Sequence, residues 1–218
     1  VRGWGDNQGT LGTGDFVLTD SYISVIEALK HAAYYLKQKP VIEWLGSEEF
    51  EEHPKNIKKL ANYNGIIVPG GFGARGVEGK IKAVEFCRKN KIPYLGLCYG
   101  LHMAVIEFAR NVCGMRGANT SEVDNSTKYP VIHTLPEQLV NIQEKKMGGS
   151  MRLGSYACEL KPGTKSFKAY GAKSITERHR HRYEVNNDFR AALEKKGLVM
   201  AGLNPERNLV EIIELRDH

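Results

Sequence analysis

The residue best placed to do chemistry is a cysteine that lies between two glycines. In Gly96-Leu97-Cys98-Tyr99-Gly100, the glycines come two positions before and two positions after the thiol. This spacing permits a sharp turn from a strand into a helix, which exposes the side chain at the carboxyl end of a sheet. Backbone N–H groups at the helix start favour a thiolate, and the N–H of Tyr99 could stabilise the oxygen of an attacked carbonyl. The pentapeptide predicts a nucleophile; a buried cysteine at a strand end is the alternative.

A glycine-rich loop at residues 69–76 is a second candidate. Its sequence, Pro-Gly-Gly-Phe-Gly-Ala-Arg-Gly, follows a short apolar strand. Closely spaced glycines let backbone N–H groups approach an anion or an oxyanion. The loop lacks the Gly-Lys-Ser or Gly-Lys-Thr ending of a phosphate-binding P-loop. It therefore indicates an anion or oxyanion contact, with an ordinary glycine-rich turn as the alternative.

Two further groups of polar residues carry less information. Residues 178–184, Arg-His-Arg-His-Arg-Tyr-Glu, form a basic run. Alternating side chains on an extended segment point to two faces, so these cations would not all meet one ligand. We expect a solvated edge, or one arginine that binds a carboxylate, and no metal or nucleic-acid site. The acids Glu78, Glu107 and Glu122 show no spacing that indicates catalysis.

The remaining cysteines are expected to be structural or uninformative. Cys87 and Cys113 fit the faces of helices, and Cys158 falls in a region with the character of a loop. No pair has Cys-x-x-Cys spacing, which disfavours a zinc site built from these residues. We expect free thiols in a reducing compartment.

The elements that must position these residues follow an alternating pattern. Apolar strand patterns at residues 65–69 and 92–97 alternate with helical patterns at about 78–89 and 101–112. Alternation of this kind predicts parallel βαβ units. Further patterns predict helices at 23–36 and 188–196, a strand at 41–45, and two strands at 198–203 and 209–215 joined by a hairpin turn. Residues 118–150 read as loops with an ambiguous segment at 135–142.

We therefore predict an α/β fold with a doubly wound, mostly parallel sheet, flanking helices and a C-terminal hairpin. No linker interrupts the pattern, so residues 16–218 are expected to form one domain after an irregular segment at 1–15.

Composition narrows the class of protein. The 218 residues include 31 Lys and Arg against 25 Asp and Glu, and 41% are hydrophobic, enough for a sizeable core. No apolar run approaches the roughly 20 residues that span a membrane, and the start does not resemble a signal peptide. The net charge of +6 is interspersed with acids, which disfavours a nucleic-acid partner. We expect a cytoplasmic protein that binds neither membrane nor nucleic acid.

Together these stretches resemble one family, the class I, triad-type glutamine amidotransferase domain of the CTP synthases. The resemblance covers roughly residues 16–218. The cysteine turn is shared by all such amidotransferases, whereas the glycine-rich loop and the basic run are more specific. The matching stretches are residues 68–73, 75–80, 95–100, 104–112, 148–154, 177–187 and 209–214.

The resemblance implies roles for individual residues. Cys98 would attack the side-chain amide of glutamine, and the N–H groups of Gly71 and Tyr99 would form the oxyanion hole. The residues that would hold glutamine are Gly71, Phe72, Tyr99, His102, Glu122 and Arg182. The reaction would pass through a glutamyl thioester and release ammonia and then glutamate. No cofactor or metal is implied in this domain.

The resemblance also implies partners outside the chain. Ammonia would pass to an amidoligase (synthase) domain preceding residue 1, which aminates UTP to CTP with ATP and Mg²⁺, in an enzyme expected to be a homotetramer. A non-catalytic binding or assembly module of the same fold is one alternative. The amidotransferase domain of another biosynthetic enzyme, such as one of purine synthesis, is a second, which residues 178–187 disfavour.

Several positions depart from the family. Tyr99 stands where the family has Leu, Leu101-His102 stand where it has Met-Gln, and a glycine-rich start replaces its first strand. The family's general base is a histidine in a His-Pro-Glu motif beyond Leu215, whereas the sequence ends at His218. We expect His218 to precede that strand, His179 and His181 to belong to the basic run, and residues 1–218 by themselves to hydrolyse glutamine slowly.

Overall fold

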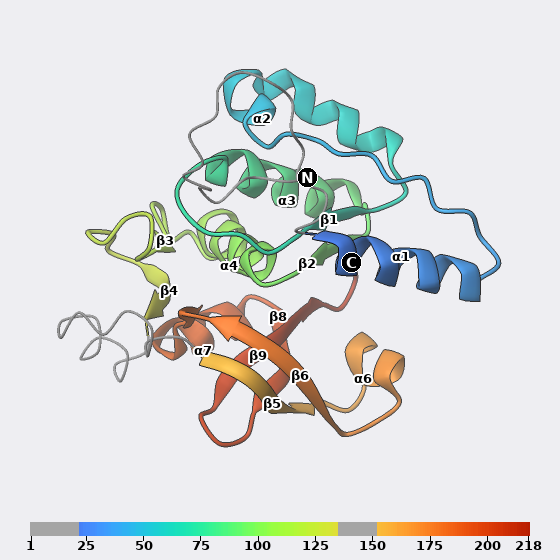
Figure 1. The fold of residues 1–218 in the computed structure, drawn as a ribbon. Coiled ribbons are helices and arrows are strands. Elements are labelled where there is room, and N and C mark those ends of the chain that lie inside the picture. Colours follow the sequence, from blue (N-terminus) through green and yellow to red (C-terminus); the bar gives the residue numbers. More distant parts are fainter. Residues whose placement is uncertain (1–21, 135–151) are drawn as a thin grey trace.

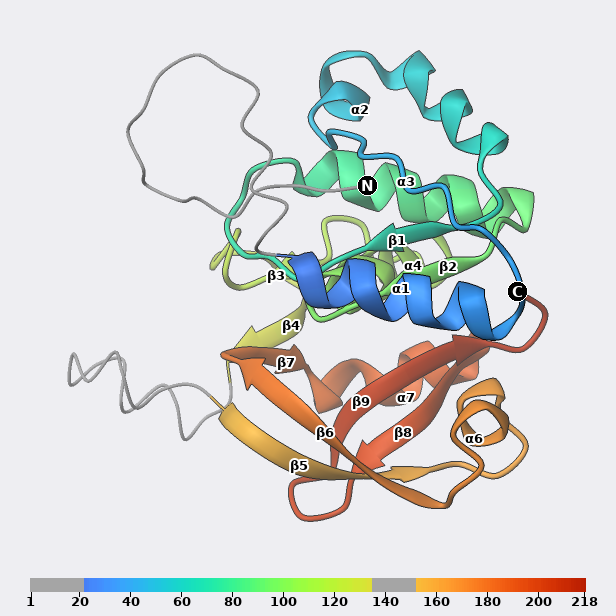
Figure 2. The same cartoon turned by 45° about the vertical axis from the view of Figure 1, so that its right-hand side comes forward.

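The computed structural model describes residues 22–134 and 152–218, and Figure 1 shows their path. The ambiguous segment at 135–142, the irregular start at 1–15 and the matching stretch at 148–151 lie outside the described residues. The described chain forms two layers, with the first half of the sequence above and the second half below in Figures 1 and 2.

The upper layer is built on one parallel βαβ unit followed by a helix. Its elements are β1 (Ile66–Val68), α3 (Val77–Asn90), β2 (Tyr94–Gly96) and α4 (Tyr99–Asn111). Strands β1 and β2 pair in parallel, with Ile66 opposite Tyr94. Helix α4 buries apolar side chains at helical spacing, including Val105, Phe108 and Ala109. The predicted alternation of strands and helices in this region is confirmed.

Three helical elements precede this unit. They are α1 (Ile23–Tyr35), α2 (Glu49–Glu52) and the 3-10 helix η2 (Pro54–Asn62). Helix α1 confirms the helix expected at 23–36, but the strand expected at 41–45 is wrong. Val41 is 90% exposed in an irregular connection, and no strand within the described ranges pairs with this segment. Strand composition alone does not produce a strand without a neighbouring edge.

The lower layer contains four of the remaining strands and two helices. They are β5 (Arg152–Leu160), α6 (Lys165–Tyr170), β6 (Ser174–His181), α7 (Asn187–Lys195), β8 (Leu198–Asn204) and β9 (Leu209–Leu215). These four strands form an antiparallel sheet in the order β6-β5-β8-β9. The predicted C-terminal hairpin is confirmed by β8 and β9, and the predicted helix at 188–196 by α7.

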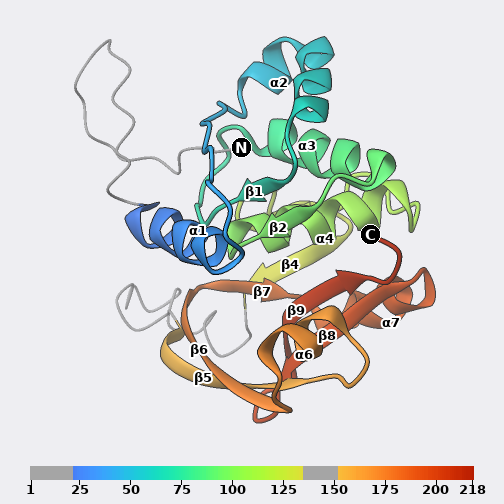
Figure 3. The same ribbon diagram turned by 90° about the vertical axis from the view of Figure 1, so that its right-hand side faces the viewer.

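A small three-stranded sheet lies between the layers in Figure 3. It contains β3 (Asn119–Thr120), β4 (Pro130–Thr134) and β7 (Tyr183–Val185), with β3 and β4 parallel and β4 and β7 antiparallel. The α/β class is confirmed, but parallel pairing is confined to β1–β2 and β3–β4 among the described strands. Each pairing in the lower sheet is antiparallel, and β8 and β9 are joined by a short hairpin turn.

The main core lies where α4 meets the lower layer. Met103 and Ile106 of α4 pack in one cluster with Ile132, Leu193 and Met200. A second, smaller cluster includes Phe50, Leu60, Ala83 and Cys87 and joins α2 and η2 to α3. Tyr99 at the start of α4 and Ala109 near its end both belong to the main cluster, which fixes the position of the turn that precedes the helix.

Candidate active site

The turn between β2 and α4 has a strained backbone at Cys98. Cys98 is the N-cap of α4 and adopts φ 53° and ψ −104°. A non-glycine residue with positive φ is uncommon, and strained residues cluster at functional sites. The sharp strand-to-helix turn predicted from the pentapeptide is therefore present, and it places the thiol beside the first turn of α4.

The two glycines of the pentapeptide are needed because the backbone passes too close for any side chain. A Cβ added at Gly96 would lie 2.6 Å from the backbone of Gly100. A Cβ added at Gly100 would lie 2.1 Å from the carbonyl oxygen of Val68 in β1. The turn is thus pressed against both β1 and its own following helix, and these contacts determine where the Cys98 sulfur points.

The glycine-rich loop lies next to the nucleophile. A Cβ added at Gly70 would lie 3.5 Å from Cβ of Cys98. The Tyr99 hydroxyl donates a hydrogen bond to the carbonyl of Gly73, and the Gly73 N–H donates to Oε1 of Glu122 at 3.0 Å. The phenol ring is almost completely buried. Tyr99 therefore fastens the loop to the start of α4, a contact that a leucine at this position could not make.

Glu122 lies against the glycine-rich loop, and Arg182 lies near Glu122. Burial raises the pKa of Glu122, although the Gly73 N–H and the positive charge of Arg182 act in the opposite direction. The two side chains are thus close enough to interact electrically. Phe72 lies in the same loop with 54% of its side chain exposed. Gly71, Phe72, Tyr99, Glu122 and Arg182 thus lie in or near one loop, and their roles stay predictions.

His102 lies in a different environment from these residues. It is buried in the second turn of α4, and its ring centroid is 6.0 Å from that of His181. Burial lowers the pKa of His102 to about 4, and the charge of His181 adds to this effect. Together with Cys98, it lines a cavity of about 710 Å³ between α4 and the strands β6 and β9. A neutral imidazole is therefore expected here at neutral pH.

His181 is the residue that sequence reasoning missed. The alternation of β6 exposes Arg178 and Arg180 and turns His179 and His181 inward, which confirms the expected two faces. The inward face lies near the nucleophile, because His181 is close enough to Cys98 for the two groups to interact electrostatically. Its Nδ1 also lies 3.5 Å from Oε2 of the buried Glu184. His181, which we expected only as a member of the basic run, therefore lies beside the candidate nucleophile.

A buried network of charges supports this face of the sheet. Arg152 of β5 is almost completely buried and lies 3.4 Å from Glu184 and 2.7 Å from Glu211 of β9. The same Glu211 lies 2.6 Å from Nε2 of His179. Buried charges require such pairing, so the network ties β5, β6, β7 and β9 together beneath the cavity.

The other sequence candidates have structural roles. Glu107 accepts hydrogen bonds from two nitrogens of Arg88, the shortest at 2.7 Å, and Glu78 pairs with Arg110. Nε2 of His218 lies 3.1 Å from the carbonyl oxygen of Cys87. Cys158 is buried in β5, so its assignment to a loop is wrong. The start of β5 does not show the polarity expected of a strand, because the charged Arg152 is buried and the apolar Leu153 is exposed.

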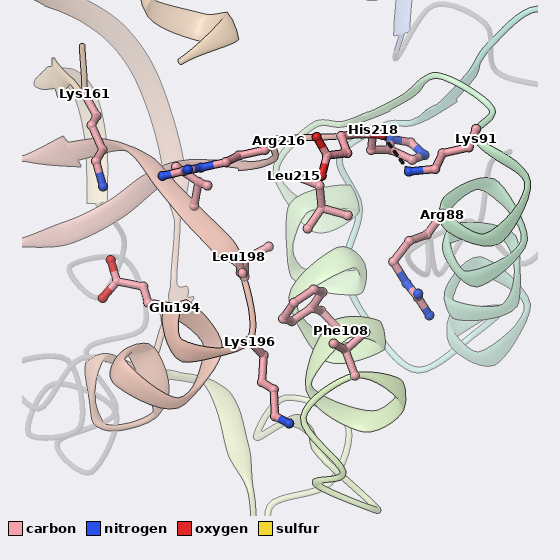
Figure 4. Close-up of a pocket in the computed structure, with 14 residues that line it drawn as sticks. Arg88, Lys91, Phe108, Lys161, Glu194, Lys196, Leu198, Leu215, Arg216 and His218 are labelled. Atoms are coloured by element: carbon pink, nitrogen blue, oxygen red, sulfur yellow. Dashed lines mark hydrogen bonds between the residues drawn. The ribbon is translucent and has the colours of Figure 1, made fainter. Parts of the chain in front are cut away.

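A second hollow of about 550 Å³ lies near the end of the chain. It is lined by basic side chains, among them Arg88, Lys91 and Lys196, together with Glu194 and the terminal residues (Figure 4). Lys91 donates a hydrogen bond to the carbonyl of Asp217 at 2.6 Å. Within the described ranges, no group of three or more His, Cys, Asp or Glu side chains is arranged to hold a metal ion. None of the helices described is long and apolar enough to cross a membrane.

Comparison with known proteins agrees with this geometry. The sequence profile of the class I glutamine amidotransferases matches residues 17–218. A CTP synthase of Caldanaerobacter subterraneus subsp. tengcongensis is 54% identical over 202 residues, which are 92% of this chain and 37% of that protein. A CTP synthase of Bacillus subtilis is 51% identical over 202 residues, again 92% of this chain and 37% of that protein. The chain thus spans little more than a third of the length of these relatives.

A solved structure extends the comparison to the fold. The glutaminase domain of Trypanosoma brucei CTPS, determined with bound acivicin, superposes with a TM-score of 0.84 at 35% sequence identity. The match covers 94% of this chain and 80% of that one. Since both the family profile and this fold span nearly all of the sequence, the chain belongs to the class I glutamine amidotransferase family, as a glutaminase domain of the CTP synthase type.

Proposed function

We propose that this domain hydrolyses L-glutamine through a thioester at Cys98. The observation that carries the proposal is the strained turn at Cys98, held by Gly96 and Gly100 at the start of α4 and flanked by the glycine-rich loop. A structural neighbour of the same family binds acivicin, a glutamine analogue. The turn exposes a thiol next to backbone N–H groups, which is the arrangement that acyl transfer to sulfur requires.

The proposed reaction has two halves. The Cys98 thiolate attacks the side-chain carbonyl carbon of glutamine, an S–C bond forms, and the negative charge moves to the carbonyl oxygen. The N–H groups of Gly71 and Tyr99 would stabilise that oxygen. The C–N bond then breaks, and the nitrogen takes a proton and leaves as ammonia. Water attacks the thioester, the S–C bond breaks, and glutamate leaves while the thiolate is restored.

Charge complementarity supports the proposed orientation of the substrate. The Arg182 guanidinium is suited to the α-carboxylate of glutamine by its charge and its fork geometry. Glu122 lies beside the loop and within the influence of Arg182, where its carboxylate suits the α-ammonium group. His102, on the cavity side of α4, is assigned to the substrate only by the resemblance.

We further propose that, in the longer protein, the ammonia supports ATP-dependent amination of UTP to CTP. The support is the similarity to CTP synthases over 92% of this chain. UTP, ATP and Mg²⁺ would bind a synthase domain outside this chain, because the loop at 69–76 lacks a P-loop ending. Assembly as a homotetramer stays a prediction.

Covalent labelling tests the proposed chemistry directly. We expect acivicin to modify Cys98 and L-glutamine to protect it. In the longer protein that contains this chain, we expect Cys98→Ala to lower glutamate release by at least about 10³-fold. Cys113→Ala is the matched control, because that thiol lies at the end of α4 beside the carbonyl of Ala192. An unlabelled Cys98, or equal activity of Cys98→Ala and wild type, would instead indicate a binding or assembly module.

The role in the longer protein needs a separate assay. In the protein that contains this chain, Cys98→Ala should abolish CTP formation with glutamine and leave CTP formation with added ammonium salt intact. Loss of both activities would contradict a role confined to ammonia supply, provided that the variant keeps its fold.

A further inference from the structure

The carbonyl groups of the glycine-rich loop at 69–76 are held by three side chains from different parts of the fold. The hydrogen bonds run from Tyr22 to Gly70 at 3.3 Å, from Tyr99 to Gly73, and from Lys80 to Arg75 at 3.0 Å. Tyr22 is the N-cap of α1, Tyr99 begins α4, and Lys80 lies in the first turn of α3. Helices α1 and α3 lie on different sides of β1 in Figure 3, so the loop is anchored from more than one direction.

The bond from Tyr22 acts on the peptide that carries a predicted oxyanion donor. The Gly70–Gly71 peptide is trans, and in a planar trans peptide the carbonyl and the following N–H point in opposite directions. Fixing the carbonyl of Gly70 therefore fixes the direction of the Gly71 N–H. This peptide lies beside the nucleophile, because a Cβ added at Gly70 would be 3.8 Å from Sγ of Cys98.

The next part of the loop is held on both sides of Gly73. Its N–H donates to Oε1 of Glu122 at 3.0 Å, and its carbonyl accepts a hydrogen bond from the Tyr99 hydroxyl. Glycine peptides rotate readily because glycine tolerates both signs of φ, and Gly73 and Gly76 adopt φ 80° and 68°. A loop this rich in glycine keeps one conformation only if such bonds outweigh the conformational entropy that it loses.

Lys80 is an unusual residue to bury beneath this loop. It is 2% exposed, and its Nζ lies 5.5 Å from the centroid of the Tyr99 ring. Burial lowers its pKa to about 8, and the charge of Arg75 adds to this effect, whereas Glu48 and Glu51 oppose it. Because burying an ammonium group costs free energy, an apolar side chain would serve better if the position only filled the core. The bond to the Arg75 carbonyl and the contact with Tyr99 thus indicate a role in holding the loop.

The two acids that face Lys80 have other partners. Glu48 pairs with Arg75 at 2.6 Å, and Glu51 accepts a hydrogen bond from the N–H of Gly79 at 3.0 Å. The hydrogen bond of the ammonium group is therefore given to the loop carbonyl, where it restrains the end of the loop opposite to Tyr22.

We propose that Tyr22 and Lys80 are positioning residues for the oxyanion hole. With the Tyr99 hydroxyl, they hold the carbonyl groups of the loop, so that the N–H of Gly71 stays directed at the oxygen of the attacked amide. They act through the loop and are assigned no contact with glutamine. This inference rests on the proposed function, in which the Gly71 N–H stabilises that oxygen.

Steady-state kinetics of glutamate release, measured in the longer protein that contains this chain, tests the proposal. We expect Lys80→Met and Tyr22→Phe each to lower kcat about 10-fold, a part of the roughly 10²–10³-fold that loss of an oxyanion donor costs. KM should change less than about 2-fold, because the affected hydrogen bond strengthens only in the transition state. The double variant should lose no more than roughly 10³-fold, since both substitutions act on the same donor.

Alkylation of Cys98 by iodoacetamide separates misplacement of the loop from displacement of the thiol. The sulfur displaces iodide from a CH₂ carbon, so no negative charge develops on a carbonyl oxygen and no oxyanion donor is needed. Modification of Cys98 is followed by mass spectrometry of its peptide. We expect both variants to alkylate within about 2-fold of the wild-type rate, whereas a variant with a displaced thiol would lose both reactions.

Two features of the variants provide the controls. Lys82→Met is matched to Lys80→Met, because Lys82 lies in the same helix and donates to the carbonyl of Phe50 in α2 at 3.3 Å. Its kcat should stay within about 2-fold of wild type. Tyr22→Phe removes only a hydroxyl and keeps the ring, which lies 5.7 Å from that of Trp44, so it tests the proposal if Lys80→Met fails to fold.

The outcomes separate this proposal from the proposed function. Equal losses in kcat and in alkylation rate, a raised KM with unchanged kcat, or a kcat equal to that of Lys82→Met would overturn the positioning role. Glutamate release by wild type would in each case leave the proposed function standing. If wild type releases no glutamate and L-glutamine does not protect Cys98 from alkylation, the proposed function falls, and this inference falls with it.

Discussion

The close packing behind Cys98 makes Gly100 sensitive to any added side chain. Replacing Gly100 with alanine adds a Cβ 2.1 Å from the carbonyl oxygen of Val68 and 3.0 Å from its carbonyl carbon. Real Cβ atoms essentially never approach closer than 3.0 Å, so β1 and α4 must separate by about 0.9 Å. Both contacting atoms belong to backbone, and no side-chain rotation can relieve the overlap.

The size of the effect follows from this displacement. Overpacking of a tight core costs about 1–3 kcal/mol, which in a domain of this size lowers the melting temperature by roughly 2–12 °C. Displacing a reacting group by about 1 Å costs about 10²-fold in rate, or about 2.7 kcal/mol of activation free energy. We therefore expect Gly100→Ala to slow the reaction of Cys98 even under conditions where the variant is fully folded.

The assay pairs thermal unfolding with the rate of acivicin labelling at Cys98. Gly65→Ala is the control, because a Cβ there would lie 3.5 Å from the carbonyl oxygen of Pro93, an ordinary contact. We expect that control to stay within about 0.5 kcal/mol of wild type and to label at the normal rate. Equal labelling rates for Gly100→Ala and Gly65→Ala, at temperatures where both are folded, would refute the argument that the close approach positions the sulfur.

Two further predictions concern buried charges. Arg88→Met leaves Glu107, whose side chain is 1% exposed, without its cation, and should lower the free energy of unfolding by about 3 kcal/mol in urea titration. Lys89→Met, in an exposed pair with Glu85, should cost under about 0.5 kcal/mol, and a similar loss in both variants would contradict the reasoning. Burial lowers the pKa of Lys80 from 10.5 to about 8, so between these values the folded chain binds fewer protons than the unfolded chain. Wild type should therefore gain up to about 3 kcal/mol relative to Lys80→Met as pH rises through that window, and a difference that does not vary with pH would exclude this effect.

Local patterns were sufficient to predict the elements that carry the nucleophile. The unit β1-α3-β2-α4 repeats its apolar positions at strand and helix spacing, and the glycines at 96 and 100 mark its sharp turn. The hairpin β8–β9 was equally predictable from the sequence, because two apolar runs flank a turn sequence. Such features depend on residues close together in the chain, so they leave a readable pattern.

Strand β5 could not be predicted because its pattern depends on residues that are distant in the chain. Its first residue, Arg152, is charged yet fully buried, whereas the adjacent Leu153 is 55% exposed. This inversion makes sense only with Glu184 and Glu211, which come from β7 and β9. The strand predicted at 41–45 is wrong for a related reason: the segment has the composition of a strand but no partner strand within the described part of the chain.

The proximity of His181 to Cys98 depends on long-range strand register. Alternation along β6 already indicates that His179 and His181 share a face, but it does not say what that face meets. The answer is set by the antiparallel pairing of β6 with β5, where His181 lies opposite Arg152, and of β7 with β4, where Glu184 lies opposite His133. A shift of one residue in the β5–β6 pairing would turn Arg180 or Arg182 toward the thiol in place of His181. The local sequence therefore predicts the candidate nucleophile, whereas the imidazole that lies beside it is determined by the pairing of distant strands.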